Sequence, residues 1–266
     1  GMKIVFLGTG GGRIVVTNQL RATGGFVIFM DGEMLHIDPG PGALVKAKEY
    51  KVRLNKLTGV LVSHKHPDHY TDAPMVIEAM NLGSREKKGV LIGSKGVLEG
   101  SGDDYPVISR YHKNIPKRVV VLDAGDETEA GKIRVRGTPI RHGDCDGVGF
   151  VLSGTKKVGY TSDTEYFEGL EKYFMDCDYL IINCIRPKEN PLKGHMDSGM
   201  AKELISKARP KVAILQHFGR MMVFGGARRE CEWIERETGI KTVAANDGMI
   251  IDSGEDEGKG IKRYLG

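Results

Sequence analysis

A segment of six residues carries four side chains of the kinds that bind metal ions in proteins. It reads His64-Lys65-His66-Pro67-Asp68-His69 and follows an apolar run at 59–62 that predicts a buried strand. In an extended segment alternate side chains share a face, so His64 and His66 can hold one cation together. Asp68 and His69 lie near the start of the next predicted helix and can face a second cation. Clustered imidazole and carboxylate groups are ligands that zinc and similar cations select, so the sequence predicts a metal site.

One short segment cannot supply all the ligands of two cations, and further candidates follow other predicted strands. They are His142 after the strand-like run at 133–140, Asp163 after the run at 157–162 and His217 after the apolar run at 212–216. A single histidine or aspartate in such a place is weak evidence. Three of them at strand ends form a pattern, which predicts that they complete the site begun by the six-residue segment.

At these residues the chain resembles the metallo-β-lactamase-fold hydrolases. The family's H-x-H-x-D-H motif corresponds to His64, His66, Asp68 and His69, its first motif to Asp38, its third to His142, its fourth to Asp163 and its fifth to His217. The resemblance extends from residue 3 to residue 252. It implies an α/β fold of the αββα type, a four-layer sandwich in which two sheets pack together between outer helices.

The resemblance also implies how the ligands divide between two divalent cations. One cation would be held by His64, His66 and His142, the second by Asp68, His69 and His217, and Asp163 would bridge the two. Asp38 would orient a ligand histidine from outside the coordination shell, although an aspartate before Pro-Gly is also typical of an ordinary turn. The ligand set suits Zn²⁺, and Mn²⁺ or iron fits the same residues.

The rest of the sequence agrees with a layered fold. Hydrophobic patterns predict strands at 3–7, 25–30, 34–38, 118–122, 132–140, 147–152, 179–182, 242–245 and 249–252, and helices at 42–50, 70–82, 165–175, 197–207 and 226–238. Early strands dominate and helices alternate with later strands, which suits two packed sheets flanked by helices. The glycine-rich segment 8–12 lacks the continuation of a phosphate loop, which argues against nucleotide binding. The family resemblance implies a glycine-rich turn beside the site there and permits a mobile loop at 18–25 near the cleft.

Composition restricts the class of protein. A chain of 266 residues without a linker-like segment suits one domain spanning 1–266, and its apolar runs are too short to cross a membrane. We therefore expect a cytoplasmic protein without a membrane partner. The four cysteines, Cys145, Cys177, Cys184 and Cys231, include no C-x-x-C pair and predict neither a zinc knuckle nor disulfides. The net charge of +4 permits nucleic acid but does not favour it over a small anionic substrate, and a homodimer is compatible with the sequence.

His195 is the candidate for a general acid. It stands in Lys193-Gly194-His195 before the helix predicted at 197–207, and the segment resembles the Gly-His pattern that phosphodiesterases and tRNA-processing nucleases of the family place near the departing oxygen. The hypothesis is that a hydroxide shared by the cations attacks phosphorus and that His195 protonates the leaving oxygen. The same segment can instead simply shape the entry of the helix. Lys193 and Arg186 either hold an anionic oxygen or are merely exposed.

These residues favour a phosphodiesterase acting on a small cyclic or nucleotide phosphodiester. Asp68, which completes the second ligand set, and His195 both support chemistry at phosphorus. An acyl hydrolase, acting on a lactone or thioester, is the alternative because the same nucleophile attacks a carbonyl carbon. The tRNA 3′-processing endonucleases of the family that this chain resembles carry a long substrate arm between the third and fourth motifs. Only 163 − 142 = 21 positions separate His142 from Asp163 here, so such an endonuclease is less favoured.

Overall fold

Two β-sheets form the framework of the protein. The computed structural model describes residues 1–254 and 261–262. The first sheet contains, in spatial order, β16 (Ile261–Lys262), β15 (Ile250–Asp252), β1 (Lys3–Gly8), β2 (Thr23–Met30), β3 (Glu33–Ile37), β4 (Gly59–Val62), β5 (Val90–Gly93) and β6 (Arg118–Val121). The second contains β14 (Lys241–Ala244), β13 (Val212–Gln216), β11 (Tyr179–Arg186), β10 (Lys157–Tyr160), β9 (Gly149–Ser153), β8 (Ile133–Thr138) and β7 (Glu127–Ala130), and β12 (Met196–Asp197) pairs with β11.

Each sheet is partly antiparallel and partly parallel. In the first sheet β3, β4, β5 and β6 run parallel, and in the second β10, β11, β13 and β14 do so. The carboxyl ends of parallel strands meet at one edge of a sheet, where α/β proteins commonly bind ligands. Isolated bridges between Gly10 and Phe218 and between His64 and Gly147 join these edges of the two sheets. Loops from both sheets therefore meet in one place.

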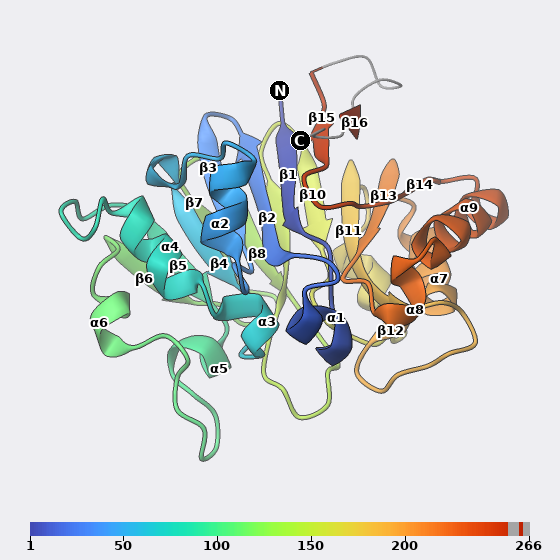
Figure 1. Ribbon diagram of the computed structural model, residues 1–266, viewed down its shortest axis with the longest axis horizontal. Helices are drawn as coiled ribbons and strands as arrows, with labels where there is room; N and C mark the ends of the chain where they lie inside the picture. The colour runs from blue at the N-terminus through green and yellow to red at the C-terminus, as the bar shows by residue number, and fades with distance from the viewer. Residues whose placement is uncertain (255–260, 263–266) are drawn as a thin grey trace.

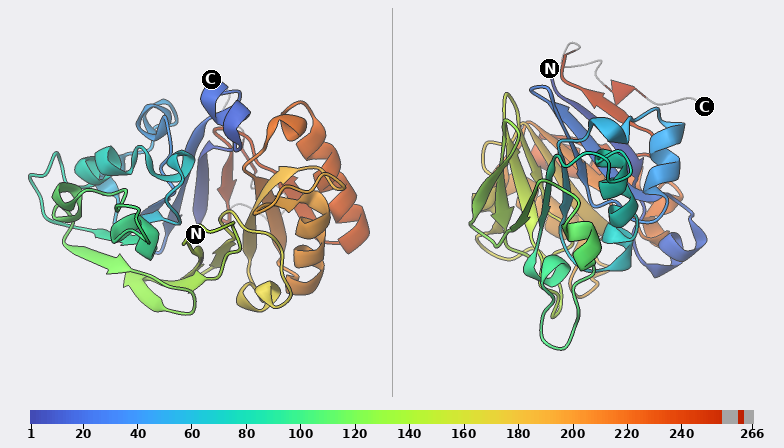
Figure 2. Two further views of the ribbon diagram at one scale, coloured as in Figure 1. Left: turned by 90° about the horizontal axis from the view of Figure 1, so that it is seen from below. Right: turned by 90° about the vertical axis from the view of Figure 1, so that its left-hand side faces the viewer.

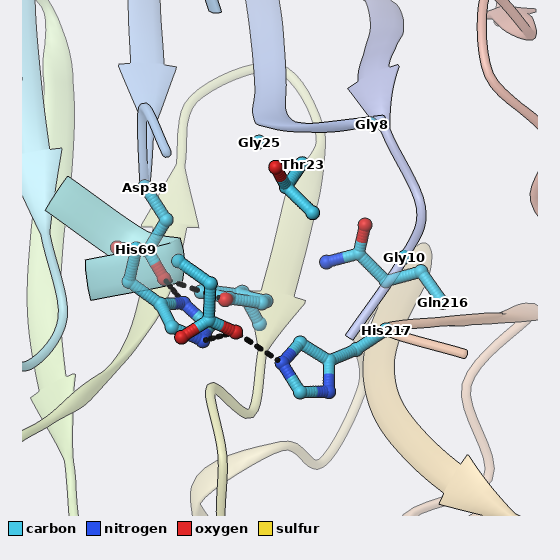
Figure 3. A pocket seen from close by; sticks show the side chains of 10 residues that line it. Gly8, Gly10, Thr23, Gly25, Asp38, His69, Gln216 and His217 are labelled. Carbon is cyan, nitrogen blue, oxygen red and sulfur yellow. Dashed lines mark hydrogen bonds and ion pairs between the residues drawn. The ribbon is translucent and has the colours of Figure 1, made fainter. Parts of the chain in front are cut away.

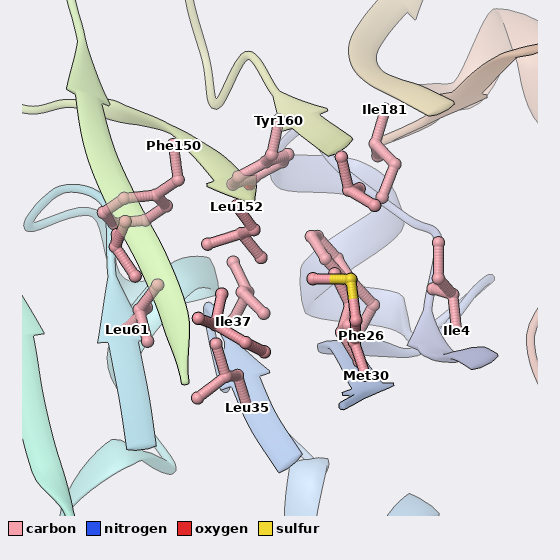
Figure 4. Close-up of a cluster of buried hydrophobic side chains, with 14 of the residues drawn as sticks. Ile4, Phe26, Met30, Leu35, Ile37, Leu61, Phe150, Leu152, Tyr160 and Ile181 are labelled. Atoms are coloured by element: carbon pink, nitrogen blue, oxygen red, sulfur yellow. The ribbon is translucent and has the colours of Figure 1, made fainter. Parts of the chain in front are cut away.

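The main hydrophobic core lies between the sheets. Phe26, Leu35 and Leu61 project from the first sheet toward Phe150 and Leu152 of the second (Figure 4). Side chains alternate along each strand, so the neighbours of these residues, such as Val27 and Met34, face the opposite side. Burying one large apolar side chain contributes roughly 1.5–3 kcal/mol, which makes this layer a principal source of stability.

Helices cover the outer face of each sheet. Over the first sheet lie α2 (Ala43–Glu49), α3 (Pro67–Tyr70), α4 (Ala73–Met80), α5 (Lys95–Leu98), α6 (Arg110–Lys113) and the 3₁₀ turn η1 (Leu54–Lys56); over the second lie α7 (Ser198–Ala208), α8 (Arg220–Val223), α9 (Gly226–Thr238) and η2 (Leu170–Tyr173). Figure 1 shows α2 and α4 in front of the first sheet. The right-hand view of Figure 2 shows the blue strands between the blue helix and the green strands of the second sheet. This layering confirms the predicted αββα sandwich.

Two of the predicted helices are wrong or incomplete. The segment predicted as a helix at 165–175 is a loop with only the short turn η2, because Gly169 adopts a left-handed φ of 97° that interrupts a right-handed helix. The helix predicted at 70–82 is the shorter helix α4, which begins at Ala73 and ends at Met80, whereas Tyr70 is the last residue of the separate helix α3. Pro74 has no N–H group to continue a helix and stands in the first turn of α4, and the N–H of Asp72 donates to the carbonyl of Pro39.

Several short elements were not predicted, and one loop assignment was wrong. Among the unpredicted elements are strands β5 and β7 and the helices α1 (Arg13–Asn18), α5, α6 and α8. The mobile loop expected at 18–25 is in part the beginning of β2, since Thr23 pairs with Gly8 of β1. Among the residues that the structure describes, no helix combines the length and the apolar character needed to cross a bilayer.

Candidate metal centre

The structure brings all seven predicted ligands together at the joined edges of the two sheets. They form two groups that share Asp163: His64, His66, His142 and Asp163, and Asp68, His69, Asp163 and His217. Within each group the potential ligand atoms all lie within 4.8 Å of one another. The histidine-rich segment comes from the first sheet, whereas His142, Asp163 and His217 come from the second. The division of ligands matches the one that the family resemblance implied.

The local backbone explains how one segment serves both groups. His64 follows the end of β4, and Pro67 occupies the first turn of α3, where a missing N–H group costs nothing. The N–H of His69 donates to the carbonyl of His66 at 2.9 Å, which turns the chain between the two ligand pairs. His64 and His66 are thereby directed to one group, and Asp68 and His69 to the other.

Asp163 lies at the centre of the cluster. Its Oδ2 atom is 3.1 Å from Nε2 of His69 and 3.5 Å from Nε2 of His64, and its Oδ1 atom is 3.3 Å from Nε2 of His217. Burial by itself would raise the pKa of Asp163, but His217 and His69 outweigh it and hold this pKa well below its usual range. The carboxylate is therefore ionised and faces both groups of histidines.

Asp38 sets the orientation of two ligand histidines, as the resemblance implied. Its carboxylate accepts hydrogen bonds from His69 Nδ1 at 2.8 Å and from the Ser63 hydroxyl at 2.7 Å. The Ser63 oxygen in turn lies 2.9 Å from Nδ1 of His64. With Nδ1 of both rings engaged in this way, the Nε2 atoms of His64 and His69 are left to face the centre, which is the usual role of carboxylates behind metal-bound histidines.

The donor set fits divalent cations. Nε2 of His64 is buried, points into the cluster and has no hydrogen-bond partner among the described residues. Burial and, to a smaller extent, the neighbouring His69 lower the pKa of His64 to about 4, so the ring is neutral and offers a lone pair. On His142, the carbonyl of Gly194 engages Nδ1 at 2.5 Å and leaves Nε2 to the centre. Imidazole nitrogens arranged around a buried carboxylate are typical ligands of zinc and related metals.

Several residues that support the site were missed in the sequence. The hydroxyl of Tyr160 donates to Asp38 at 2.6 Å, and the amide of Asn183 donates to Asp163 at 2.8 Å. The side chain of Gln216 donates to the Asn183 oxygen at 3.0 Å. Ser63 stands directly before the histidine motif, so its position was a usable signal. Tyr160, Asn183 and Gln216 carried no such signal, because only the pairing of their strands brings them together.

The backbone is strained at three points around the centre. Asp38, Ser162 and His217 have φ values of 51°, 57° and 63°, in the left-handed region that non-glycine residues seldom adopt. Each such residue costs roughly 1–3 kcal/mol and persists only where surrounding contacts hold it. All three follow strands at the edge where the ligands meet. The strain is therefore concentrated at the site.

His195 lies against both ligand groups. Its ring centroid is 4.7 Å from that of His142 in one group and 5.8 Å from that of His217 in the other. The ring is half-buried, and burial lowers its pKa to about 4. Asp197 caps α7 by accepting from the N–H of Met200 at 3.0 Å, so the segment also shapes the entry of the helix. Shaping the helix and placing His195 beside the ligands are thus compatible, and its role as an acid stays a prediction.

An open cleft adjoins the centre. It has a volume of about 430 Å³ and is lined by Lys65, His66, His142, Gly143, Asp144, Cys145 and Lys193. Lys65 forms an ion pair with Asp104, whereas Lys193 is exposed at the cleft wall. Arg186 donates to the carbonyl of Pro191 at 3.4 Å and does not line the cleft. Of the two basic side chains considered for binding an anionic oxygen, Lys193 and Arg186, only Lys193 thus lines the cleft.

A second, much smaller cavity lies on the inner side of the ligands. Its volume is about 20 Å³, and it is bounded by Gly8, Gly10, Thr23, Gly25, Asp38, Asp68, His69, Tyr160, Gln216 and His217. Figure 3 shows Asp38 and His69 on one side of this space and His217 on the other. The glycine-rich turn predicted beside the site is confirmed here, since Gly8 and Gly10 form part of the wall.

Comparison with known proteins agrees with this geometry. A family model described as a beta-lactamase superfamily domain matches residues 34–218. An uncharacterized protein of Methanocaldococcus jannaschii is 39% identical over 94% of this chain and 95% of its own length. A protein of Methanosarcina mazei named ribonuclease Z is 24% identical over 94% of this chain and 76% of its own length.

Solved structures show the same fold. The metallo-beta-lactamase fold protein YhfI from Bacillus subtilis superimposes with a TM-score of 0.75 at 21% identity, over 94% of this chain and 98% of that one. A diphosphatase from the PhnP family gives a TM-score of 0.71 at 15% identity, over 95% and 98%. At such identities the likeness concerns the fold alone, and it agrees with the order of layers described above.

Proposed function

This chain belongs to the beta-lactamase superfamily and is a hydrolase of the metallo-β-lactamase fold, and we propose that it cleaves a small phosphodiester at a centre of two divalent cations. One cation would be held by His64, His66 and His142 and the other by Asp68, His69 and His217, with Asp163 facing both groups. Cations in such a centre act as Lewis acids and lower the pKa of water toward neutrality. Zn²⁺ is the cation that we propose, because every ligand in these two sets of three except Asp68 is an imidazole, and Mn²⁺ and iron are the alternatives.

The position of His195 is the observation that favours cleavage of a phosphodiester over hydrolysis of an acyl compound. Its ring lies against His142 and His217, one from each ligand group, so it faces the whole centre rather than only one cation. A departing alkoxide is a poor leaving group and needs a proton from a positioned acid. His195 is the half-buried titratable group placed to give that proton, and Asp68 remains a ligand that also anchors His217 at 3.2 Å.

The low pKa of His195 defines when it can act as an acid. Burial holds this pKa at about 4 in the free protein, so the ring is neutral at pH 7. The negative charge of Asp163 already opposes that effect, and a phosphodiester anion beside the ring opposes it in the same direction. An anionic substrate beside the ring would therefore raise the pKa of His195 and favour uptake of a proton from water, which the ring can then give to the leaving oxygen. A neutral lactone or thioester provides no such charge, which favours phosphorus over the acyl alternative.

The cleft beside His66 and His142 suits a small substrate. Its volume of about 430 Å³ lies in the range of pockets that bind ligands of drug size. Lys193 provides a positive charge at its wall. The names ribonuclease Z and diphosphatase, carried by a relative and by a structural neighbour, both denote cleavage at phosphorus and support this substrate class.

Charge at the cleft argues against structured RNA. Asp144 lines the cleft beside Lys193, and Asp104 pairs with Lys65, so negative side chains offset the two lysines there. Proteins that bind nucleic acid normally offer a basic surface there. Together with the short segment between His142 and Asp163, this favours a cyclic or nucleotide phosphodiester over tRNA.

The variant His195→Ala tests the proposal. We expect turnover of a 2′,3′-cyclic nucleotide, which has an alkoxide leaving group, to fall roughly 10²–10³-fold, because general acids contribute on that order. Turnover of bis-p-nitrophenyl phosphate, whose leaving group needs no proton, should fall far less, and metal content should stay unchanged. His112→Ala, at a histidine that pairs with Glu78 outside the site, is the control.

Equal losses on both phosphodiesters would remove the acid role of His195. A screen of the wild-type enzyme against lactones and thioesters separates the two enzyme classes. Faster hydrolysis of those carbonyl compounds than of any phosphodiester would overturn the proposed substrate class and support acyl hydrolysis.

A further inference from the structure

His217 differs from three other ligand histidines in how its ring is held. His64, His69 and His142 each have Nδ1 within hydrogen-bond distance of an oxygen, from Ser63, Asp38 and Gly194 respectively. Nδ1 of His217 is buried and has no such partner among the described residues. Metal-bound histidines usually depend on that second hydrogen bond for their orientation. Nε2 of His217 lies near Asp68 and Asp163, and the ring stacks against His69, but on the Nδ1 side its position depends on packing rather than on a hydrogen bond.

The glycine-rich turn provides that packing. Gly11 packs so closely against the ring that a Cβ atom on this residue would overlap Nδ1 and Cε1 of His217. The turn is tied to the loop after β13 by two backbone hydrogen bonds, from Phe218 N–H to Thr9 C=O at 2.8 Å and from Gly11 N–H to Phe218 C=O at 3.1 Å. The position of the ring thus depends on where Thr9 and Gly11 lie. It also depends on the φ of 63° at His217, which these contacts maintain.

Asp247 holds the turn in place. Its Oδ1 atom accepts from the N–H of Thr9 at 2.9 Å and from the Thr9 hydroxyl at 2.8 Å. Its Oδ2 atom accepts from the N–H of Ala22 at 2.8 Å, just before β2. One carboxylate therefore joins the turn to the beginning of the neighbouring strand. Asp247 itself lies between β14 and β15 and is not a member of either ligand group.

Arg21 completes the arrangement. Its guanidinium donates to the Thr9 hydroxyl at 3.0 Å and to the carbonyl of Ala245 at 2.9 Å, and it lies over the ring of Phe218 at 5.1 Å from the centroid. The Thr9 hydroxyl can accept from Arg21 because it donates its own proton to Asp247. Contacts on both sides thus fix Thr9, and through it Phe218, the residue that follows the ligand His217.

We propose that Asp247 is a positioning residue for the second cation site, acting through Thr9 and Gly11 on the His217 ring. The inference rests on the two-cation centre of the proposed function. It predicts a selective effect: loss of the Asp247 carboxylate weakens the site formed by Asp68, His69 and His217. The site formed by His64, His66 and His142 is left intact, because Ser63 and Gly194 orient the rings of His64 and His142 independently.

The test compares Asp247→Ala with Asp178→Ala. Asp178 also accepts from a backbone N–H, that of Lys157 at 2.8 Å, and from Lys211 Nζ at 2.8 Å, but it lies at the opposite ends of the strands from the metal centre. Zinc content is measured by elemental analysis after desalting, and affinities by competition with a chromogenic chelator. For Asp247→Ala we expect one of two zinc ions to bind at least roughly tenfold more weakly, in line with substitutions behind a metal ligand. Asp178→Ala should retain both.

A milder variant guards against a folding failure. Asp247→Asn keeps an oxygen for Thr9 but places an amide donor against the N–H of Ala22, so a smaller loss at the same site is expected. In the zinc-free protein, the imidazole NMR signals of His217 should shift in both Asp247 variants while those of His64 stay in place. This measurement does not depend on activity or on bound metal.

The possible results separate the two proposals. Two zinc ions bound by Asp247→Ala with affinities within twofold of the wild type would overturn the role of Asp247 and leave the proposed function standing. Equal weakening of both sites would also overturn it, since that is the effect of general destabilisation. A wild-type protein that binds fewer than two zinc ions would refute the centre itself and this inference with it.

Discussion

The substitution Asp38→Asn tests the idea that one buried carboxylate orients ligands of both cations. Oδ2 of Asp38 accepts from Ser63, His69 and Tyr160, and Oδ1 accepts from the N–H of Ser63 at 2.7 Å. Burial alone would raise the pKa of Asp38, but the hydrogen bonds from His69 and Tyr160 and the charges of His69 and His64 together outweigh it and leave this pKa below its usual value. The group is thus a carboxylate that only accepts hydrogen bonds.

The size of the effect follows from the number of donors that an amide can still accept. If the amide oxygen of the variant takes the place of Oδ2, its nitrogen faces the N–H of Ser63 and two donors oppose each other. If the oxygen takes the place of Oδ1, the bonds from Ser63 Oγ, His69 and Tyr160 are lost. The first arrangement loses less. We expect metal affinity to fall roughly 10–100-fold, or about 1.4–2.8 kcal/mol, as is common for partners behind a ligand histidine.

Competition with a chelator of known zinc affinity measures this change. Asp31→Asn is the matched control, because Asp31 accepts from the N–H of Thr155 at 2.7 Å in the turn between β2 and β3, away from the ligands. The control should bind both zinc ions as the wild type does. If Asp38→Asn bound them with affinities within twofold of the wild type, the hydrogen bonds from Asp38 would not be orienting His64 and His69.

Two further predictions concern pH and the glycine-rich turn. Burial lowers the pKa of His36, His64 and His195 to about 4. In the zinc-free protein these histidines therefore bind protons at a higher pH when the chain is unfolded than when it is folded. The free energy of unfolding should thus fall as pH drops from about 6.5 toward 4. In urea titrations with EDTA, His36→Leu should reduce that slope by about 1.4 kcal/mol per pH unit, the contribution of one proton, and an unchanged slope would contradict the assignment. Gly11→Ala should displace His217 and reduce zinc content toward one ion per chain. Gly254→Ala, at a glycine without a left-handed φ whose Cβ position meets only a carboxylate oxygen of Asp252 at 3.3 Å, should retain two. Full occupancy in both would refute the close packing of Gly11.

The ligands could be predicted from the sequence because they either cluster in one short segment or directly follow a predicted strand. Four of the seven stand within six residues, and the run at 212–216 that precedes His217 coincides with β13. A strand that ends in a polar ligand places that ligand at the edge of its sheet without further information. The pattern therefore predicts where each ligand lies along its own strand. The meeting of the two edges came from the family resemblance.

Short or atypical elements could not be predicted in the same way. Strand β7 reads Glu-Thr-Glu-Ala and lies at the edge of its sheet, where only its alanine is buried, so no apolar pattern marks it. The segment 165–175 has apolar residues at helical spacing, yet Gly169 and the nearby loop contacts prevent a helix. In both cases the surrounding structure determines the backbone conformation, because the local preference for helix or strand is weak.

The residues that orient the ligands were the hardest to predict from the sequence. Asn183 and Gln216 become neighbours because β11 and β13 pair in a register that aligns these two positions, and Asn183 then reaches Asp163. Asp247 acts on Thr9, which lies 238 positions away along the chain. Such groups are ordinary polar residues in any local window, and their role exists only after the sheets have formed. Substitutions at these residues should therefore weaken metal binding while the ligands and the fold remain. For this reason the Asp247 and Asp38 variants test whether the ligands must be oriented by their neighbours or need only lie close together.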